Sequence, residues 1–419
     1  MTVAPPDGRD WIARRALPFS IAACAILWIG PYWSWPTPGY FRFSVVAVIV
    51  AFGASMATRC RTFSLRDILL ALLLLALMLY YASHTGRGGP FEISYGWVAL
   101  VFFMLVDDDT KRRAFHDFAI MFALTLVPGM VVFVFSAVGI ELPWHTLYAA
   151  RFDFEVLRGN DPGYYREYLG SVVRNDQVYS VGPGSVFRLH GMWDEPGTVG
   201  TFSGLLLVAG GMQLKGKLHN VILLIGGILS FSLAFYTILF LYFLGRRPLA
   251  TLAASGGVAA LVLSSKALST LPIVDLFFLS RFTLNKGGGL AADNRVTGVF
   301  AALYRDFWNA DLWTRLFGST NNVALLVNTG TFSYEVVVFT YGVVGMTLLV
   351  AFLVAATTSI SMRRQALILL VIFLVSIYQR PNVLTMPYLV LLMGGAVHLA
   401  REARRSADSG LFAPAAAAS

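Results

Sequence analysis

Long apolar runs recur along the chain and constrain its fold more than any other feature. The interior of a membrane contains no water to satisfy backbone amides and carbonyls, so a long apolar run crosses it as a helix. Hydrophobic residues make up 57% of the chain and charged residues 13%, with a mean hydropathy of +0.67, which excludes a soluble globular protein. We therefore predict an all-α, polytopic membrane protein with about 12 transmembrane helices. The predicted spans are residues 17–33, 43–58, 67–83, 94–106, 116–139, 197–213, 219–230, 232–245, 249–265, 334–360, 366–379 and 383–400.

Basic clusters orient these spans. With twelve spans the clusters alternate with connections that carry almost no charge, and the positive-inside rule then predicts that both termini are cytoplasmic. One helix across 220–245 would put Lys215 and Arg246 on opposite sides, so two short helices are favoured there. The clusters are Arg9/Arg14/Arg15, Arg59/Arg61/Arg66, Lys111/Arg112/Arg113, Lys215/Lys217, Arg246/Arg247, Arg363/Arg364 and Arg401/Arg404/Arg405.

The basic clusters that orient the spans account for most of the net charge of +9, so no nucleic-acid partner is expected. Basic residues precede the first apolar run, but no small-residue cleavage site follows it, which predicts an uncleaved first span. Cys24 and Cys60 are too few and too poorly placed for a disulfide or a metal site. We expect one integral membrane domain over residues 1–419, with a disordered tail at 406–419.

Two connections are long, and with this topology both lie on the outer face. They are a first outer loop, residues 141–195, and a second outer loop, residues 266–332. Loops this long inside a compact domain usually bind or catalyse.

The first loop ends in a segment with charge at a predicted helix start. Pro196 is suited to the first helical position, and Asp194 and Glu195 suit the positive end of the helix dipole. Arg188 lies close to the free amides of that helix, which can themselves bind an anion. The alternative is an ordinary capped helix with an interfacial arginine.

Aromatic residues of the same loop are candidates for binding sugar rings. Tyr164, Tyr165 and Trp193 combine an apolar ring face with a polar group, as sugars require, although such residues also populate membrane interfaces.

The second loop carries Arg281, a Gly287–Gly289 triplet and then Arg295. The triplet indicates a hinge, because the residues of a Walker phosphate loop do not follow it. After Arg295, the spacing of apolar residues over 296–304 predicts an amphipathic helix on the membrane surface.

These motifs resemble the O-antigen polymerase and O-antigen ligase superfamily of bacterial inner-membrane enzymes. Arg188, Gly191 and Pro196 are similar to its R-x-x-G-x-x-x-x-P pattern, and Arg295 to its second arginine. Phe317-Gly318 and then Tyr334 with Gly342/Gly345 resemble its downstream signatures. The resemblance covers residues from about 185 to 400.

The resemblance implies a glycosyltransferase that takes glycan from a polyprenyl diphosphate carrier. Arg188, Arg295 and Arg281 are the expected diphosphate-binding residues, since a guanidinium offers a permanently charged, bidentate fork. No acidic cluster in the outer loops has the spacing of a metal site, so we expect metal-independent chemistry and no cofactor. The expected partners are the carrier-linked glycan, the lipid bilayer, a chain-length regulator and a flippase.

Attack by a sugar hydroxyl needs a base, for which the candidates are Glu195, His190, Asp194 and Glu335. Ligases of this superfamily carry a histidine where this chain has Thr331-Phe332-Ser333, which favours a polymerase of O-antigen or exopolysaccharide repeat units. Two alternatives stay open: a ligase of the same superfamily, and a transporter of lipid-linked oligosaccharide or polysaccharide. Transporters carry broken helices and midplane charges, and few of either are expected here.

Overall fold

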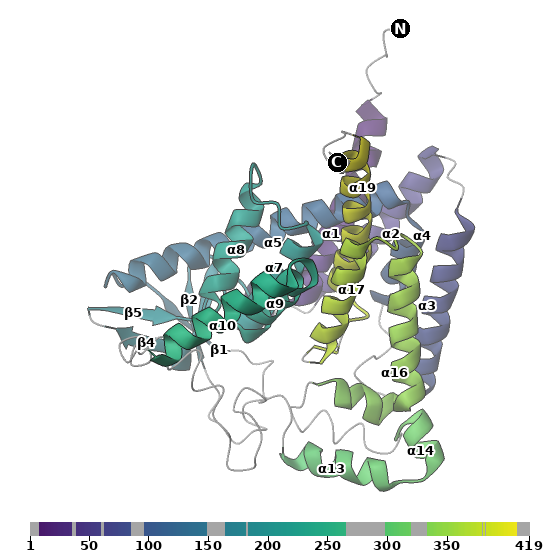
Figure 1. Cartoon of the computed structure of the whole chain (residues 1–419). Coiled ribbons are helices and arrows are strands. Elements are labelled where there is room, and N and C mark those ends of the chain that lie inside the picture. Colours follow the sequence, from purple (N-terminus) through teal and green to yellow (C-terminus); the bar gives the residue numbers. More distant parts are fainter. Residues whose placement is uncertain are drawn as a thin grey trace, which may run out of the picture.

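The chain folds into a mostly helical assembly with a small strand-containing region at one side (Figure 1). The computed structural model describes residues 8–35, 39–59, 63–84, 96–148, 164–181, 183–264, 298–319, 333–378, 380–381 and 383–408. Its helices are α1 (Gly8–Ile29), α2 (Gly39–Arg59), α3 (Leu65–His84), α4 (Gly96–Leu105), α5 (Asp108–Ala137), α7 (Pro196–Ala209), α8 (Leu218–Leu229), α9 (Leu233–Arg246), α10 (Pro248–Ser264), α13 (Gly298–Asn309), α14 (Leu312–Phe317), α16 (Tyr334–Thr358), α17 (Arg364–Ile377), α18 (Met386–Leu389) and α19 (Gly395–Asp408).

The predicted helical architecture is confirmed, and the length and composition of several helices are consistent with a membrane protein. Among the described residues, four helices are long and apolar enough to cross a bilayer: α2, α3, α5 and α16. Shorter apolar helices include α4, α7, α8, α9 and α17. At 1.5 Å per residue, a 14-residue helix such as α7 is roughly 21 Å long, less than the hydrocarbon core of about 30 Å. α8 and α9 are separate helices, as the charge pattern predicted for 220–245.

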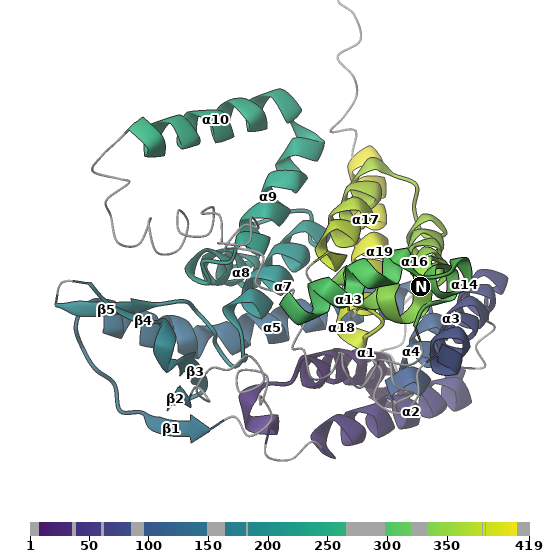
Figure 2. The same ribbon diagram turned by 90° about the horizontal axis from the view of Figure 1, so that it is seen from below.

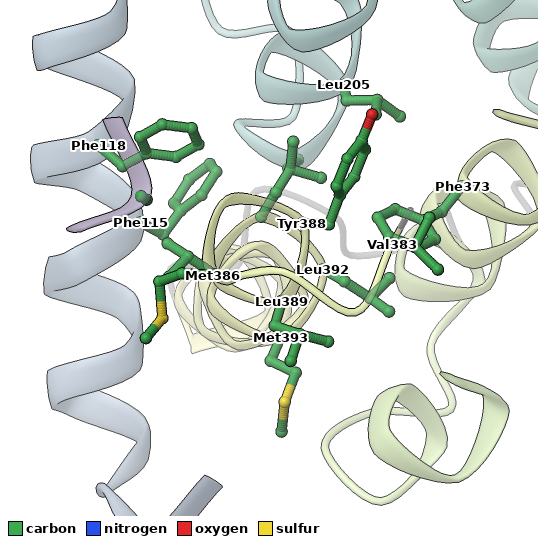
Figure 3. Close-up of a cluster of buried hydrophobic side chains, with 14 of the residues drawn as sticks. Phe115, Phe118, Leu205, Phe373, Val383, Met386, Tyr388, Leu389, Leu392 and Met393 are labelled. Atoms are coloured by element: carbon green, nitrogen blue, oxygen red, sulfur yellow. The ribbon is translucent and has the colours of Figure 1, made fainter. Parts of the chain in front are cut away.

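The core forms where the last helical rod meets α5, α7 and α17. α18, the π-helical turn Val390–Gly394 and α19 follow one another without a break, and their inner residues are fully buried. Figure 3 shows Tyr388 and Leu389 of this rod among Phe115, Leu205 and Phe373. Between membrane helices such packing stabilises through close contact rather than through water exclusion. Residues 406–408 belong to α19, so the predicted disordered tail is wrong for them, and its remainder lies outside the described residues.

Several of the basic clusters meet at one end of the helices. Lys111 Nζ lies 3.0 Å from Asp67 Oδ1, which ties α5 to α3. Arg401 Nη1 lies 2.7 Å from Asp109 Oδ1, which ties α19 to α5. The clusters around Arg66, Lys111 and Arg401 therefore share one location, as a common membrane face requires.

α16 is broken, in a chain for which few broken helices are expected. Gly342 has φ 69° and ψ 179°, outside any helical geometry, so the element consists of two helical pieces joined at that residue. The break in turn accommodates Gly318, which ends α14 with φ 92°, because a Cβ on either glycine would overlap the other segment's backbone. Figure 1 shows the short lower piece of α16 turned away from the long one.

The first outer loop contains strands, so the all-α prediction is wrong in this region. β1 (His145–Tyr148), β2 (Tyr164–Tyr168) and β3 (Ser171–Arg174) form an antiparallel sheet, and β4 (Val178–Val181) pairs with β5 (Gly184–Phe187). Leu169 and Gly170 turn β2 into β3, with φ 74° at the second of the two residues, where a type II turn requires a positive φ and favours glycine. These strands of four or five residues are too short to give a clear alternating pattern, which is why the sequence did not indicate them.

The second outer loop contains the predicted amphipathic helix. α13 covers Gly298–Asn309 and buries Phe300 and Phe307 against Phe339 of α16. In Figures 1 and 2, α13 lies across the end of the bundle rather than along it.

Candidate functional site

The helix start predicted at Pro196 is confirmed and anchors the candidate site. Pro196 is the first residue of α7, and Glu195 precedes it in an extended conformation without capping the helix through its side chain. The segment before it is tied down on two sides. Leu189 N donates to Leu229 O of α8 at 2.9 Å, and Gly191 O accepts from Val172 N of β3 at 2.8 Å. The segment from 187 to 196 thus joins the strands to the membrane helices.

Glu195 forms an ion pair with an arginine that the sequence reasoning missed. Arg380 Nη2 donates to Glu195 Oε2 at 2.9 Å, with the two side chains 21% and 44% exposed. Arg380 lies between α17 and α18, in a connection predicted to be on the outer face. A basic residue in such a connection departs from the positive-inside pattern, and this was the signal that could have identified it.

Asp194 is a titratable neighbour of this ion pair. Burial, together with the negative charge of Glu195, raises the pKa of Asp194 to about 7. A carboxyl with such a pKa can both accept and release a proton near neutral pH. Its backbone carbonyl accepts from Tyr165 Oη at 3.2 Å, which couples β2 to the site.

Arg188 contacts the turn between α8 and α9. Its Nε donates to Ser230 O at 3.2 Å, and its Nη2 lies 3.4 Å from Phe231 O. These bonds hold the guanidinium beside the start of α9. Arg188 therefore contributes positive charge near the α7 end and also holds two helix ends together.

His190 and Trp193 lie in the packed interior. His190 is fully buried, its Nδ1 donates to Arg188 O at 2.7 Å, and burial lowers its pKa to about 3. Its ring is therefore neutral at pH 7 and positions the segment around it. Trp193 is also fully buried and stacks on Phe122 at a centroid distance of 5.2 Å. Neither ring offers a face that a sugar or a water molecule can reach directly.

The predicted tyrosines belong to β2. Tyr165 is nearly buried and packs edge-on against Trp35, with ring centroids 5.3 Å apart. Tyr164 is half-buried and pairs with Tyr148 across the β1–β2 ladder. Tyr165 is structural in this arrangement, whereas Tyr164 is the more exposed of the two.

Glu335 lies in the first turn of α16, close to the same end of the molecule. The adjacent Tyr334 stacks on Tyr378 at 5.4 Å, two positions before Arg380. The start of α16 thus adjoins the connection that carries Arg380. Arg281 and Arg295 lie outside the described residues.

In the described part of the chain, no group of three or more His, Cys, Asp or Glu residues is arranged to hold a metal ion. Comparisons with protein-family models, with curated proteins and with solved structures give no match to this chain. The resemblance to the O-antigen polymerase and ligase superfamily therefore depends on the sequence motifs alone.

Proposed function

We propose that this chain is a membrane glycosyltransferase that joins polyprenyl-diphosphate-linked oligosaccharide repeat units into O-antigen or exopolysaccharide. The reaction would take place at the outer face of the bacterial inner membrane. The observation that carries the proposal is the Glu195–Arg380 ion pair, with Asp194 beside it, at the start of α7.

The diphosphate would bind between Arg380 and the first amides of α7. A helix N-terminus favours an anion, and a guanidinium binds phosphate oxygens bidentately. The carboxylate of Glu195 is the anion that now pairs with Arg380, and the diphosphate would compete with it. Arg188 lies in the same segment, and Arg295 and Arg281 remain proposed ligands by the family resemblance.

Asp194 is the proposed base, in place of Glu195. The acceptor hydroxyl would attack the anomeric carbon as the bond from that carbon to the diphosphate oxygen breaks. The diphosphate would leave with the bonding electrons, and the hydroxyl proton would pass to the Asp194 carboxylate. Positive charge from Arg380 and the helix end would stabilise the leaving group.

The proposed topology has twelve membrane segments and both termini in the cytoplasm. It is supported by the meeting of basic clusters at one end of the helices. Some helices are shorter than the bilayer core, and they would cross it only if the connections beside them also lie within the bilayer. These are α4, α7, α8, α9 and α17. A ligase of the same superfamily would use the same site, with a different acceptor.

One observation favours a second candidate, a transporter of lipid-linked oligosaccharide or polysaccharide. Secondary transporters use discontinuous helices at their substrate sites, and α16 is discontinuous at Gly342. The charged residues of the candidate site lie at the α7 end, however, and not at this break.

Purified protein with carrier-linked repeat units in vesicles separates these functions. A polymerase makes chains longer than one unit, whether a divalent metal is added or chelated. A ligase transfers glycan only when a separate acceptor is supplied, and a transporter moves units across the vesicle without lengthening them. Failure to make any chain longer than one unit would remove the polymerase assignment.

A further inference from the structure

A cavity of about 310 Å³ lies between the C-terminal end of α5 and strands β2, β4 and β5, away from the α7 site. Figures 1 and 2 show β4 and β5 beside this half of α5. The lining of the cavity is rich in groups that form hydrogen bonds. The residues that matter for binding are Ser136, Glu141, Arg166, Tyr168, Ser180 and Ser185.

Close backbone contact forms the floor of the cavity. A Cβ on Gly184 of β5 would overlap the carbonyl oxygens at the end of α5, and one on Gly139 would lie 2.8 Å from Pro183 O. Ser136 Oγ and Ser185 Oγ lie 2.7 Å apart across the same junction. The helix end and the β4–β5 hairpin therefore hold the cavity in a fixed shape.

The polar groups are arranged in a cation–aromatic–carboxylate series. The Arg166 guanidinium lies 4.9 Å from the Trp144 ring centroid, and Trp144 Nε1 donates to Glu141 Oε1 at 3.2 Å. Asn175 Oδ1 accepts from Arg166 Nε at 2.8 Å, which orients the guanidinium. No carboxylate within the described ranges lies within salt-bridge distance of Arg166.

The charges of the site indicate an uncharged ligand. One guanidinium is offset by one carboxylate, and the C-terminal end of α5 adds partial negative charge. An anionic ligand would gain from Arg166 but would be repelled by Glu141 and the helix end. A neutral pyranose matches the site better, because its hydroxyls both donate and accept and its CH face packs on an aromatic ring.

We propose that this cavity is a binding site for a neutral pyranose residue of the glycan, held by Glu141, Arg166 and Tyr168. This proposal rests on the proposed function in one respect, namely that the glycan is the one carried by the polyprenyl diphosphate. β5 leads directly from Gly184 to Arg188, roughly 13 Å at about 3.3 Å per residue. A glycan of a few residues would thus extend from the cavity to the α7 site.

The test is a binding measurement on the purified full chain in detergent, with maltotriose and triacetylchitotriose as neutral probes and galacturonate trimer as the anionic one. Tryptophan fluorescence reports binding, and Trp144→Phe identifies the signal that comes from this site. We expect a neutral probe to bind the wild type with millimolar affinity and more tightly than galacturonate. Glu141→Gln and Arg166→Lys should each weaken that binding about tenfold, since glutamine removes the charge of the acceptor and lysine cannot reproduce the paired donors of the guanidinium.

Arg174→Lys is the matched control, because Arg174 lies on the adjacent strand β3 but does not line the cavity. It should change binding less than twofold, and unchanged circular dichroism establishes that each variant is folded. The proposal fails if neither neutral probe binds, if galacturonate binds more tightly, or if Arg166→Lys binds as the wild type does. Binding without any chain growth would remove the proposed function and leave this site standing, whereas chain growth without binding would do the reverse.

Discussion

Arg380 Nη2 lies 2.9 Å from Glu195 Oε2, which brings together two residues 185 positions apart at the start of α7. Each comes from a connection next to a short apolar helix, α17 on one side and α7 on the other. The pair places one positive and one negative group where a helix end already favours an anion. This relationship is the basis of the proposed diphosphate site.

Arg380→Gln should abolish chain growth while lowering stability only slightly. A partly exposed ion pair contributes about 0–1 kcal/mol, so the thermal unfolding midpoint should fall by a few degrees at most. Chain length on a gel and the unfolding midpoint in detergent are the two measurements. Arg401→Gln is the control, since Arg401 also pairs with an aspartate, at 2.7 Å, and Asp109 keeps Arg112 and Arg113 as partners. Normal chain length in Arg380→Gln would exclude Arg380 from the diphosphate site.

Asp194→Asn should stabilise the protein, and increasingly so as the pH rises. Burial raises the pKa of Asp194 from 3.8 to about 7, so between these values the folded chain keeps a proton that the unfolded chain has lost. The stability contributed by this proton is fully present below pH 3.8 and is lost as the pH rises through 7. The difference between the unfolding midpoints of variant and wild type should therefore grow from pH 4 to pH 7 and then level off.

Asp311→Asn provides a control of opposite sign for that experiment. Hydrogen bonds from Thr314 lower the pKa of Asp311, so its contribution is present near neutral pH and is lost as the pH falls below its ordinary value. The cost of Asp311→Asn should accordingly shrink in acid. A difference for Asp194→Asn that does not vary with pH would contradict the assigned pKa.

Gly318→Ala and Gly342→Ala should each destabilise the protein by at least about 2 kcal/mol, because both residues have positive φ and neither leaves space for a Cβ. Gly53→Ala in α2 is the control: its Cβ would meet nothing within 4 Å, and a helical glycine is destabilising by about 0.5–1 kcal/mol relative to alanine. The measurement is the unfolding midpoint of each of the three variants, compared with that of the wild type. Wild-type stability in Gly342→Ala would mean that α16 can close its break.

Lys111→Met should destabilise the protein by about 1.5–3 kcal/mol, because the buried Asp67 loses a charge-assisted hydrogen bond from α5 and keeps only Arg66, at 2.9 Å, as a cationic partner. Lys111 is fully buried and also donates to Met104 O at 2.9 Å. The double variant Asp67→Asn/Lys111→Met removes both charges and should recover much of the loss. Denaturant titrations of the three proteins measure this coupling, and additive costs in the double variant would show that the two charges do not interact.

The topology can be tested with a reporter enzyme that is active only outside the cytoplasm. Fusions after Gly170, in the β2–β3 turn, and after Gly298, at the start of α13, should be active. Fusions after Lys217 and Arg364 should be silent. Activity after Lys217 would overturn the proposed orientation.

The sequence by itself determined the membrane class, the positions of the apolar helices and the start of α7 at Pro196. These features depend on local composition, on charge at helix ends and on proline at the first helical position, all of which can be read along the chain. It also indicated two separate helices, α8 and α9, because charge at Lys215 and Arg246 has to remain on one side.

Only the tertiary structure decided which residues meet. It paired Glu195 with Arg380 and placed His190 and Trp193 in the core, because burial depends on what packs against a segment from elsewhere in the chain. It also placed an interruption in α16 at Gly342, where Gly318 approaches the backbone of α16 more closely than any side chain would permit. Contacts between residues far apart in sequence leave no periodic signal within either segment, so they could be found only in the folded chain.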